Sequence, residues 1–161
     1  MDKLTRERGG AALPPQPEVR GLHAANQMTG FTAVQRQLVR KRAGNGDPAE
    51  ARCEATGVWL GEHGGEIQHR RARGMGGSRL RNRLSNAALL SCEAHRICES
   101  RDTRMYAMGF WLRAGDDPES KAIRLHGRRL VWLDDEGSYR DRDGRLLCSV
   151  PAGGDMWSPG F

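Results

Sequence analysis

The stretch of residues 66–77 constrains this chain more than any other part of its sequence. It reads Glu-Ile-Gln-His and continues with arginines and glycines. Apolar and polar residues alternate up to His69, which is typical of a half-buried β-strand, and the glycines that follow indicate a loop. We therefore expect His69 where a strand gives way to a positively charged loop. That position suits a base acting on a phosphate backbone.

Arginines crowd the loop that follows this histidine. No Asp or Glu occurs between Glu66 and Glu93, and the glycines of the loop allow a ligand to approach the backbone closely. A guanidinium group is planar and can bind two phosphate oxygens at once. A solvated, disordered basic loop is the alternative. If the loop does bind phosphates, the residues expected to do so are Arg70, Arg71, Arg73, Arg79 and Arg81.

The overall charge favours the same partner. The chain of 161 residues has a formal net charge of +6, and only three of its 26 basic residues are lysines. An arginine excess of this kind favours nucleic acid as the partner class, although a basic surface without a partner would have the same composition. The length indicates a single domain with appendages. The 21 glycines and seven prolines indicate much loop and a small core. Small cores often need a staple, such as a metal or a partner chain.

Residues 1–30 have the composition of a flexible arm. The first ten are polar and charged, and the chain contains no long apolar run, so we expect neither a signal peptide nor a membrane span. The expected location is the cytoplasm, where the four cysteines would serve metal binding or core packing before disulfides.

Thr32 can cap a helix, and Val34, Leu38 and Val39 follow it at helical spacing. Basic residues cover the rest of this segment, residues 32–42. Two interpretations stay open: a helix that faces DNA, and an amphipathic helix that covers a small core with a solvated basic face.

The pattern after the arginine loop predicts a second antiparallel strand over residues 85–92 and then a helix over residues 93–108. His95 and Glu99 are four residues apart and would share one face of this helix, where an imidazole and a carboxylate can bind a divalent cation. Residues 122–149 alternate between short apolar runs and turns, which indicates short antiparallel strands.

This order of strand, arginine loop, strand and helix resembles the ββα-metal motif of the HNH endonucleases. The matching residues are Gln68-His69, Asn86 and His95. The sequence around these residues is similar to that of the small HNH proteins of tailed phages and prophages. The motifs cover about residues 50–112, and residues 126–139 look like the C-terminal hairpin of those proteins.

The resemblance implies an α+β fold, with a ββα-metal (HNH) core, an N-terminal helix and a C-terminal antiparallel β-hairpin region. The corresponding division of the chain is a flexible arm at residues 1–30, a nuclease domain at 31–112, a β-hairpin extension at 113–150 and a tail at 151–161.

The resemblance also assigns roles. His69 would be the base that activates water, a task suited to a group that titrates near neutral pH. Asn86 would orient the loop or His69. A divalent metal ion would be held by Gln68 and His95, with Glu99 as a further ligand. Mg²⁺ is the expected ion, and Mn²⁺, Ni²⁺ or Zn²⁺ are the alternatives.

Two departures from the family pattern bear on this assignment. The residue before the base is usually a His or Asp that binds the metal, whereas Gln68 offers an uncharged amide and a weaker ligand. Relatives often hold a structural zinc on two C-x-x-C pairs, but here only Cys53 and Cys92 remain. Cys98 or His63 could substitute, but we do not expect a structural zinc; cysteines that pack in the core are the alternative.

The sequence thus predicts a metal-dependent endonuclease that hydrolyses double-stranded DNA. A phage setting would link it to DNA processing or packaging beside a terminase, which is an analogy from the family. The alternative is a catalytically impaired, DNA-binding protein with the same scaffold, which the glutamine and the broken cysteine pairs favour. A secreted nuclease toxin is a third interpretation, and the lack of any export segment argues against it.

Overall fold

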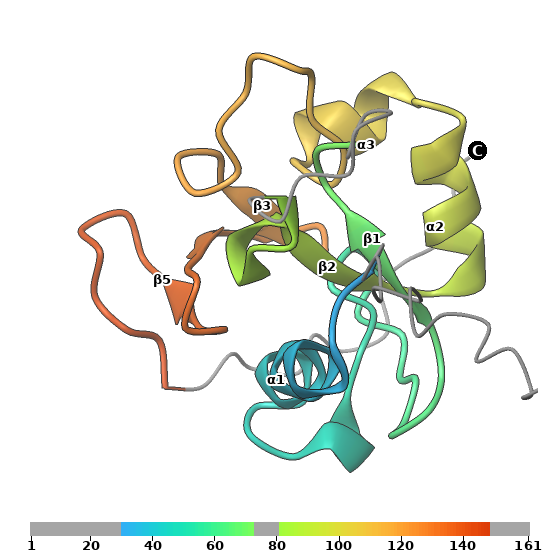
Figure 1. The fold of residues 1–161 in the computed structure, drawn as a ribbon, viewed down its shortest axis with the longest axis vertical. Coiled ribbons are helices and arrows are strands. Elements are labelled where there is room, and N and C mark those ends of the chain that lie inside the picture. The colour runs from blue at the N-terminus through green and yellow to red at the C-terminus, as the bar shows by residue number, and fades with distance from the viewer. Residues whose placement is uncertain (1–29, 73–80, 149–161) are drawn as a thin grey trace, which may run out of the picture.

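A short β-hairpin stands at the centre of the fold, with helices around it and a second sheet beside it (Figure 1). The computed structural model of the protein describes residues 30–72 and 81–148. The expected arm, apart from Gly30, and the expected tail lie outside these ranges. The predicted combination of helices and antiparallel sheets, an α+β fold, is confirmed. In chain order the elements are α1 (Ala33–Ala43), η1 (Pro48–Glu50), β1 (Glu66–His69), η3 (Leu84–Asn86), β2 (Ala87–Leu90), α2 (Cys92–Glu99), α3 (Thr103–Ala107), β3 (Ile123–Leu125), β4 (Arg129–Leu133) and β5 (Tyr139–Arg140).

Strands β1 and β2 pair antiparallel, in the order that the sequence predicts. His69 lies opposite Ala87 at the end of β1, where the strand was expected to end. β2 is shorter than residues 85–92, the predicted strand. Before it the chain forms the 3-10 turn η3, and after it the Ser91 hydroxyl accepts a hydrogen bond from the Ala94 amide and caps α2.

All four residues of β2 are buried, because each face of the hairpin covers a separate apolar cluster. Ala87 and Leu89 belong to a cluster with residues of α1, whereas Ala88 and Leu90 belong to a larger cluster with residues of α2, β3 and β4. A strand that is buried on both faces needs an unbroken apolar run. The hairpin is therefore the wall between two cores.

Helix α1 begins with a capping box. The Thr32 hydroxyl accepts a hydrogen bond from the Gln35 amide at 3.1 Å, and the Gln35 side chain accepts one from the Thr32 amide at 2.9 Å. These bonds satisfy two N–H groups that the helix leaves without partners. Arg42 is buried, and Arg40 donates to the Gly64 carbonyl at 2.8 Å. The structure thus favours a helix that covers a core over one whose basic face is free for DNA.

The helix predicted over residues 93–108 is wrong as a single element. α2 and α3 are separate, and Arg101 between them lies in the left-handed region at φ 59°. The Asp102 carboxylate accepts a hydrogen bond from the Arg104 amide at 2.7 Å and caps α3, since aspartate bonds its own backbone better at a helix start than inside a helix. No helix in the described ranges has the length and apolarity needed to cross a membrane.

The short strands predicted over residues 122–149 form the antiparallel sheet β3–β4–β5. Leu125 of β3 pairs with Arg129 of β4, so residues 126–128 form the turn between the strands. His126 and Gly127 have φ values of 51° and 70°, and two successive positive φ values are typical of a type I′ turn. Ile123 of β3 lies in the same apolar cluster as residues of α2. The segment proposed as a C-terminal extension therefore shares its core with the hairpin.

One carboxylate lies where these elements meet. Glu54 is fully buried, and its Oε1 accepts hydrogen bonds from Arg42 Nε at 2.9 Å and from the Tyr139 hydroxyl at 2.6 Å. Its Oε2 accepts from Arg42 Nη2 at 3.1 Å and from the Leu89 amide at 2.7 Å. Burial and the Glu54 charge raise the pKa of Tyr139, so its phenol stays a donor. α1, β2 and β5 are thus bound to one side chain.

We expect Glu54→Gln to lower the free energy of unfolding by about 3–5 kcal/mol, because the Arg42 charge would stay buried without its counter-charge. Urea denaturation followed by circular dichroism measures this change. The matched control is Glu50→Gln, the same substitution at an exposed position, which should change stability by no more than about 0.5 kcal/mol. Equal effects of the two substitutions on stability would contradict the conclusion that Glu54 holds α1, β2 and β5 together.

Candidate active site

The predicted site residues of β1 face different sides of the hairpin. Successive side chains of a strand point to opposite faces. Ile67 packs in the cluster with residues of α1, and His69 is on the same side. Glu66 contacts His95 of α2, and Gln68 shares the face of Glu66. The expected base and the expected metal ligand beside it therefore approach the end of the strand from opposite faces.

His69 is held on two sides by residues that the sequence analysis did not single out. Its Nε2 lies 2.9 Å from the Asn82 side-chain oxygen. The Phe31 ring stacks on the imidazole, with 4.1 Å between ring centroids and 17° between planes. No spacing rule could have revealed either contact, because Phe31 precedes α1 and Asn82 lies 13 residues after His69, near the end of the arginine loop.

Asn86 acts on the loop rather than directly on His69. Its side chain is buried, and its oxygen accepts a hydrogen bond from the Arg71 amide at 2.7 Å. Its side-chain nitrogen donates to the Arg71 carbonyl at 3.1 Å and to the Arg81 carbonyl at 2.8 Å. One amide group therefore bonds the chain on both sides of residues 73–80. The resemblance implies that Asn86 orients the loop or His69; these bonds are to the backbone of the loop, and the role stays a prediction.

His95 is held by a carboxylate from the hairpin. Its Nδ1 lies 2.9 Å from Glu66 Oε2 and 3.9 Å from Glu99 Oε1, and its side chain is 19% exposed. A carboxylate on one ring nitrogen fixes the imidazole and leaves the other nitrogen to act as a ligand. Glu66 was missed in the sequence, although its place two residues before Gln68 puts both on one face of the strand.

On this side of the hairpin, Glu66 and Glu99 both approach His95 at Nδ1, at 2.9 and 3.9 Å. Gln68 shares the strand face of Glu66. Gln68 Nε2 donates to the His69 carbonyl at 3.1 Å, so the amide oxygen is the atom of this side chain that can coordinate a cation. Imidazole and oxygen donors together suit a divalent ion in their chemistry. Within residues 30–72 and 81–148, no three His, Cys, Asp or Glu side chains are grouped to hold a metal.

Arg70 is not available to DNA, which corrects the sequence prediction. Its side chain is among the largest that are fully buried, at 1% exposure. The guanidinium donates to four backbone carbonyls at 2.6–2.8 Å, those of Ser85, Gly109, Pro118 and Lys121. Burial and the nearby Arg42 charge lower the pKa of Arg70 to about 9, which still leaves it charged at neutral pH. Arg70 joins the end of β1 to the second half of the chain.

The other loop arginines have mixed positions. Arg71 is half-buried, and its Nη1 donates to the Asp116 carbonyl at 3.2 Å. The Arg81 guanidinium donates to the Ala72 carbonyl across the start of the loop. Arg73 and Arg79 lie outside the described residues. Contact of the loop with DNA phosphates therefore stays a prediction for Arg71, Arg73, Arg79 and Arg81.

The cysteines are divided between core and surface. Cys53 and Cys98 are buried in one apolar cluster, whereas Cys92 and Cys148 are exposed. Burial and the neighbouring Cys53 raise the pKa of Cys98 to about 12, so its thiol stays protonated at neutral pH. Cys53 and Cys98 thus pack as small core residues, the use that the sequence analysis left as the alternative to zinc.

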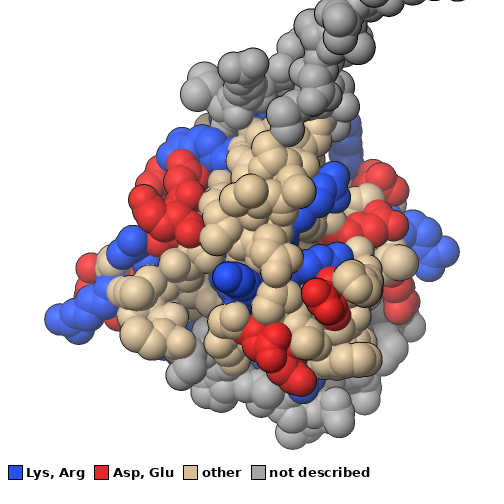
Figure 2. Space-filling view, turned by 60° about the horizontal axis from the view of Figure 1, so that its bottom comes forward, with Lys and Arg blue, Asp and Glu red and all other residues tan. Residues whose placement is uncertain are grey.

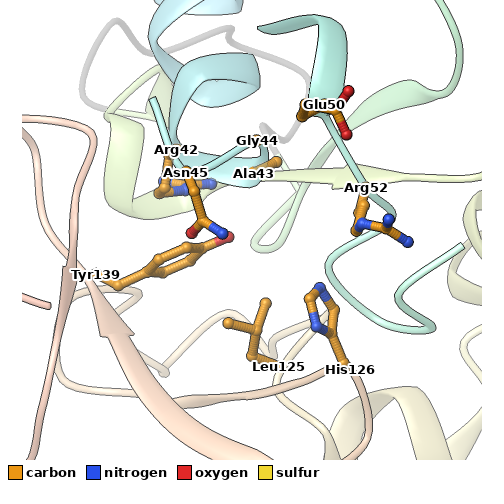
Figure 3. Close-up of a pocket in the computed structure, with 9 residues that line it drawn as sticks. All are labelled: Arg42, Ala43, Gly44, Asn45, Glu50, Arg52, Leu125, His126 and Tyr139. Carbon is orange, nitrogen blue, oxygen red and sulfur yellow. The ribbon is translucent and has the colours of Figure 1, made fainter. Parts of the chain in front are cut away.

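A pocket of about 210 Å³ lies away from these residues, between the end of α1 and the β3–β4 turn. Figure 3 shows Asn45 beside the Tyr139 ring, with Leu125 and His126 across the cavity. Burial lowers the pKa of His126, which favours its neutral form. None of the predicted catalytic or metal-binding residues lines the pocket. We therefore place the candidate site at the end of β1. The full lining is Arg42, Ala43, Gly44, Asn45, Glu50, Arg52, Leu125, His126 and Tyr139.

Figure 2 shows the molecule after a rotation about the horizontal axis that brings the bottom of Figure 1 toward the viewer. On this face the lysines and arginines of the described residues are interspersed with acidic residues around a central uncharged area. The positive net charge is therefore not gathered into one continuous patch here.

Comparisons with known proteins add no relative to this description. No protein-family model matches the chain, and searches of curated proteins and of solved structures gave no match. A function for this chain therefore has to be argued from the contacts of the residues at the end of β1 and from the sequence resemblance described above.

We expect Arg70→Lys to lower the free energy of unfolding by about 2–4 kcal/mol, because one ammonium group cannot reach the four carbonyls that the guanidinium bonds. Thermal and urea unfolding measure the loss. Arg96→Lys is the matched control on the exposed side of α2 and should be nearly neutral. A stable Arg70→Lys protein with weakened DNA binding would restore the original prediction for this residue.

Proposed function

We propose that the protein is a metal-dependent HNH endonuclease that hydrolyses phosphodiester bonds of double-stranded DNA. The observation that carries this proposal is the placement of two histidines around one hairpin. His69 ends β1, and His95 lies on the helix that follows β2, where Glu66 holds its Nδ1 at 2.9 Å. Strand, strand and helix follow one another in the order that the resemblance requires.

His69 is suited to the role of general base. An imidazole titrates near neutral pH and can take a proton from a water molecule. The Phe31 ring and the Asn82 amide hold the imidazole in one orientation, which a base needs if it is to meet the attacking water in a fixed geometry. Asn86 supports this arrangement by fixing the backbone next to the histidine.

The residues that would hold a divalent ion are Gln68, His95 and Glu99, with Mg²⁺ as the expected ion. Such an ion, when bound, stabilises the negative charge on the scissile phosphate and on the leaving oxygen. Glu66 keeps the His95 ring in place and directs its Nε2 outward as a ligand. The loop arginines, Arg71 and Arg81 among them, would hold the flanking phosphates.

A catalytically impaired DNA-binding protein is the second candidate, and one observation favours it. Gln68 stands where the family places a charged or imidazole ligand, and its amide nitrogen is bonded to the His69 carbonyl. An amide oxygen binds Mg²⁺ more weakly than a carboxylate does. In this case the arginine loop would bind DNA while the site fails to hold its ion.

Plasmid nicking tests the two candidates. We expect the wild-type protein to convert supercoiled DNA to the nicked form in the presence of Mg²⁺, Mn²⁺, Ni²⁺ or Zn²⁺. His69→Ala should be at least about 100-fold slower, because general-base catalysis contributes that much or more. His63→Ala is the control, since the His63 side chain is 91% exposed; this variant should retain the wild-type rate.

A gel-shift assay with the same variants completes the test. If wild-type protein and His69→Ala are both inert with every ion but bind DNA equally, the nuclease is excluded and the DNA-binding candidate stands. If neither cleavage nor binding is found, both candidates fail.

We expect Gln68→Asp to raise the affinity for Mg²⁺ or Mn²⁺ about tenfold, since a carboxylate adds a charge that the amide lacks. Isothermal titration calorimetry of the free protein with each ion measures the change without DNA. Gln37→Asp makes the same change of charge at an exposed position of α1 and controls for general electrostatics. Equal affinities of these two variants would show that Gln68 does not contribute to an ion site.

A further inference from the structure

We propose that the pocket between the end of α1 and the β3–β4 turn binds a guanine base, which Glu50, Arg52 and His126 recognise. The pocket has a volume of about 210 Å³, and none of the residues proposed for catalysis or metal binding lines it. The inference goes beyond the proposed function, because a base could bind here whether or not the protein cleaves DNA.

The walls of this pocket suit a flat ring whose edges are polar. Leu125 and the Tyr139 ring lie at its inner side, with 1% and 5% exposure, whereas Glu50 is exposed at its outer edge. Figure 3 shows Arg52 and His126 on the side of the cavity opposite Tyr139. Pockets for drug-sized ligands have volumes of roughly 300–1,000 Å³, so this smaller cavity suits a single ring system whose sugar stays outside in solvent.

Some polar groups of the lining are already used, and others are open to a ligand. The Arg42 guanidinium and the Tyr139 hydroxyl both donate to Glu54. In the part of the chain that the structure describes, however, neither the Glu50 carboxylate nor the ring nitrogens of His126 have a hydrogen-bond partner. The pocket therefore presents a carboxylate and an imidazole whose bonding capacity is unused.

Arg52 and His126 are held in place by residues 53–57, the turn with the incomplete cysteine pattern. Arg52 Nη1 donates to the Gly57 carbonyl at 3.1 Å, which leaves Nη2 for a ligand. The His126 amide donates to the Glu54 carbonyl at 2.8 Å, and a Cβ at Gly57 would lie 3.3 Å from the imidazole. Burial lowers the pKa of His126, and the Arg52 charge adds to this, so the imidazole is mainly neutral at pH 7. Both side chains are thus placed before a ligand arrives, which lowers the cost of binding.

The chemistry of these groups matches guanine. A carboxylate only accepts hydrogen bonds and a guanidinium only donates them, so Glu50 and Arg52 together require a ligand with donors on one edge and acceptors on another. Guanine has N1–H and its 2-amino group side by side, and its O6 and N7 are the acceptors that an arginine binds as a pair. Adenine in the same orientation would turn the N1 lone pair toward the carboxylate and its 6-amino group toward the guanidinium.

An α-amino acid is the rival ligand, since its ammonium and carboxylate groups could also pair with Glu50 and Arg52. The rings of Tyr139 and His126 in the lining favour a base, because an aliphatic ligand has no flat face to stack on them.

Isothermal titration calorimetry with guanosine monophosphate and adenosine monophosphate is the first test. The two nucleotides carry the same phosphate, so a difference in affinity reports the base. We expect a Kd below about 1 mM for guanosine monophosphate and a Kd at least about tenfold higher for adenosine monophosphate, since a site that bonds one set of polar groups rejects an analogue that leaves them unpaired. Equal affinities, no binding of guanosine monophosphate, or tighter binding of leucine would each overturn the proposal.

Glu50→Gln should reduce the preference for guanosine over adenosine monophosphate to about threefold or less, because an amide can donate to adenine as well as accept from guanine. Folding should survive this change, since Glu50 is exposed. Glu62→Gln is the matched control at an exposed position outside the pocket and should keep the wild-type preference. An unchanged preference in Glu50→Gln would show that this carboxylate does not read the base, and the proposal would be wrong.

Proton NMR of the histidine rings locates the bound nucleotide. Guanosine monophosphate should shift the ring signals of His126 and leave those of His63, whose side chain is 91% exposed, unchanged. His126→Asn identifies the signals and should weaken binding about fivefold or more, since asparagine tolerates the left-handed backbone but lacks the ring. Shifts at other histidines without a shift at His126 would place the nucleotide elsewhere and overturn the proposal.

Competition distinguishes the two sources of the base. If an oligothymidylate with one central guanine displaces guanosine monophosphate and plain oligothymidylate does not, the base comes from an unpaired strand; if neither displaces it, the ligand is a free nucleotide. Equal displacement by both strands would show that the pocket does not read guanine. A protein that binds guanine but cleaves no DNA would keep this inference and remove the proposed nuclease, and an active nuclease without this preference would do the reverse.

Discussion

The ion pair between Arg42 and Glu54 joins distant parts of the chain at one buried point. Burying two charges is costly, and attraction alone repays the cost only when the remaining hydrogen-bonding capacity is used. Here it is used: both Glu54 oxygens accept two hydrogen bonds, and Arg42 also donates to the Leu84 and Ala87 carbonyls at 3.2 and 2.7 Å. The pair thereby fixes α1 against β2. At the start of α1, Phe31 stacks on His69 and Gln35 bonds Asn82, the other residue that contacts His69.

The hairpin positions the residues of the candidate site between the two apolar clusters. Because β2 is buried on both faces, β1 beside it has one side toward α1 and one toward α2. The base lies on the first side and the donors for a cation on the second. Gln68 and His69 are adjacent in the sequence, but each faces a different apolar cluster. A substitution in one cluster therefore directly affects the position of only one of them.

Sequence patterns predicted the elements well where a local rule governs them. Thr32 begins α1 through its capping box, and the apolar alternation ends at His69 as the strand does. The prediction of one long helix was wrong because Asp102 accepts a hydrogen bond from a backbone N–H and starts a new helix, which the helical spacing of Met105 and Met108 does not reveal.

The contacts of the candidate site were harder to predict, because they join residues far apart in the chain. Glu66 of β1 contacts His95 of α2, and Phe31, which precedes α1 in the chain, stacks on His69. Arg70 looked like its neighbours in a run of arginines, yet its guanidinium bonds four backbone carbonyls in the core. Charge in a sequence does not distinguish a buried guanidinium from an exposed one.

The Asn86 amide has a consequence for how this protein can vary. By bonding the backbone of Arg71 and of Arg81, it closes the loop between them with a single side chain. The entropy of a closed loop changes only slowly with its length, so residues can be added or exchanged between these two points at small cost. The part of the chain that would meet DNA is thus separated from the part that holds the histidine, and new binding preferences can arise without rebuilding the site.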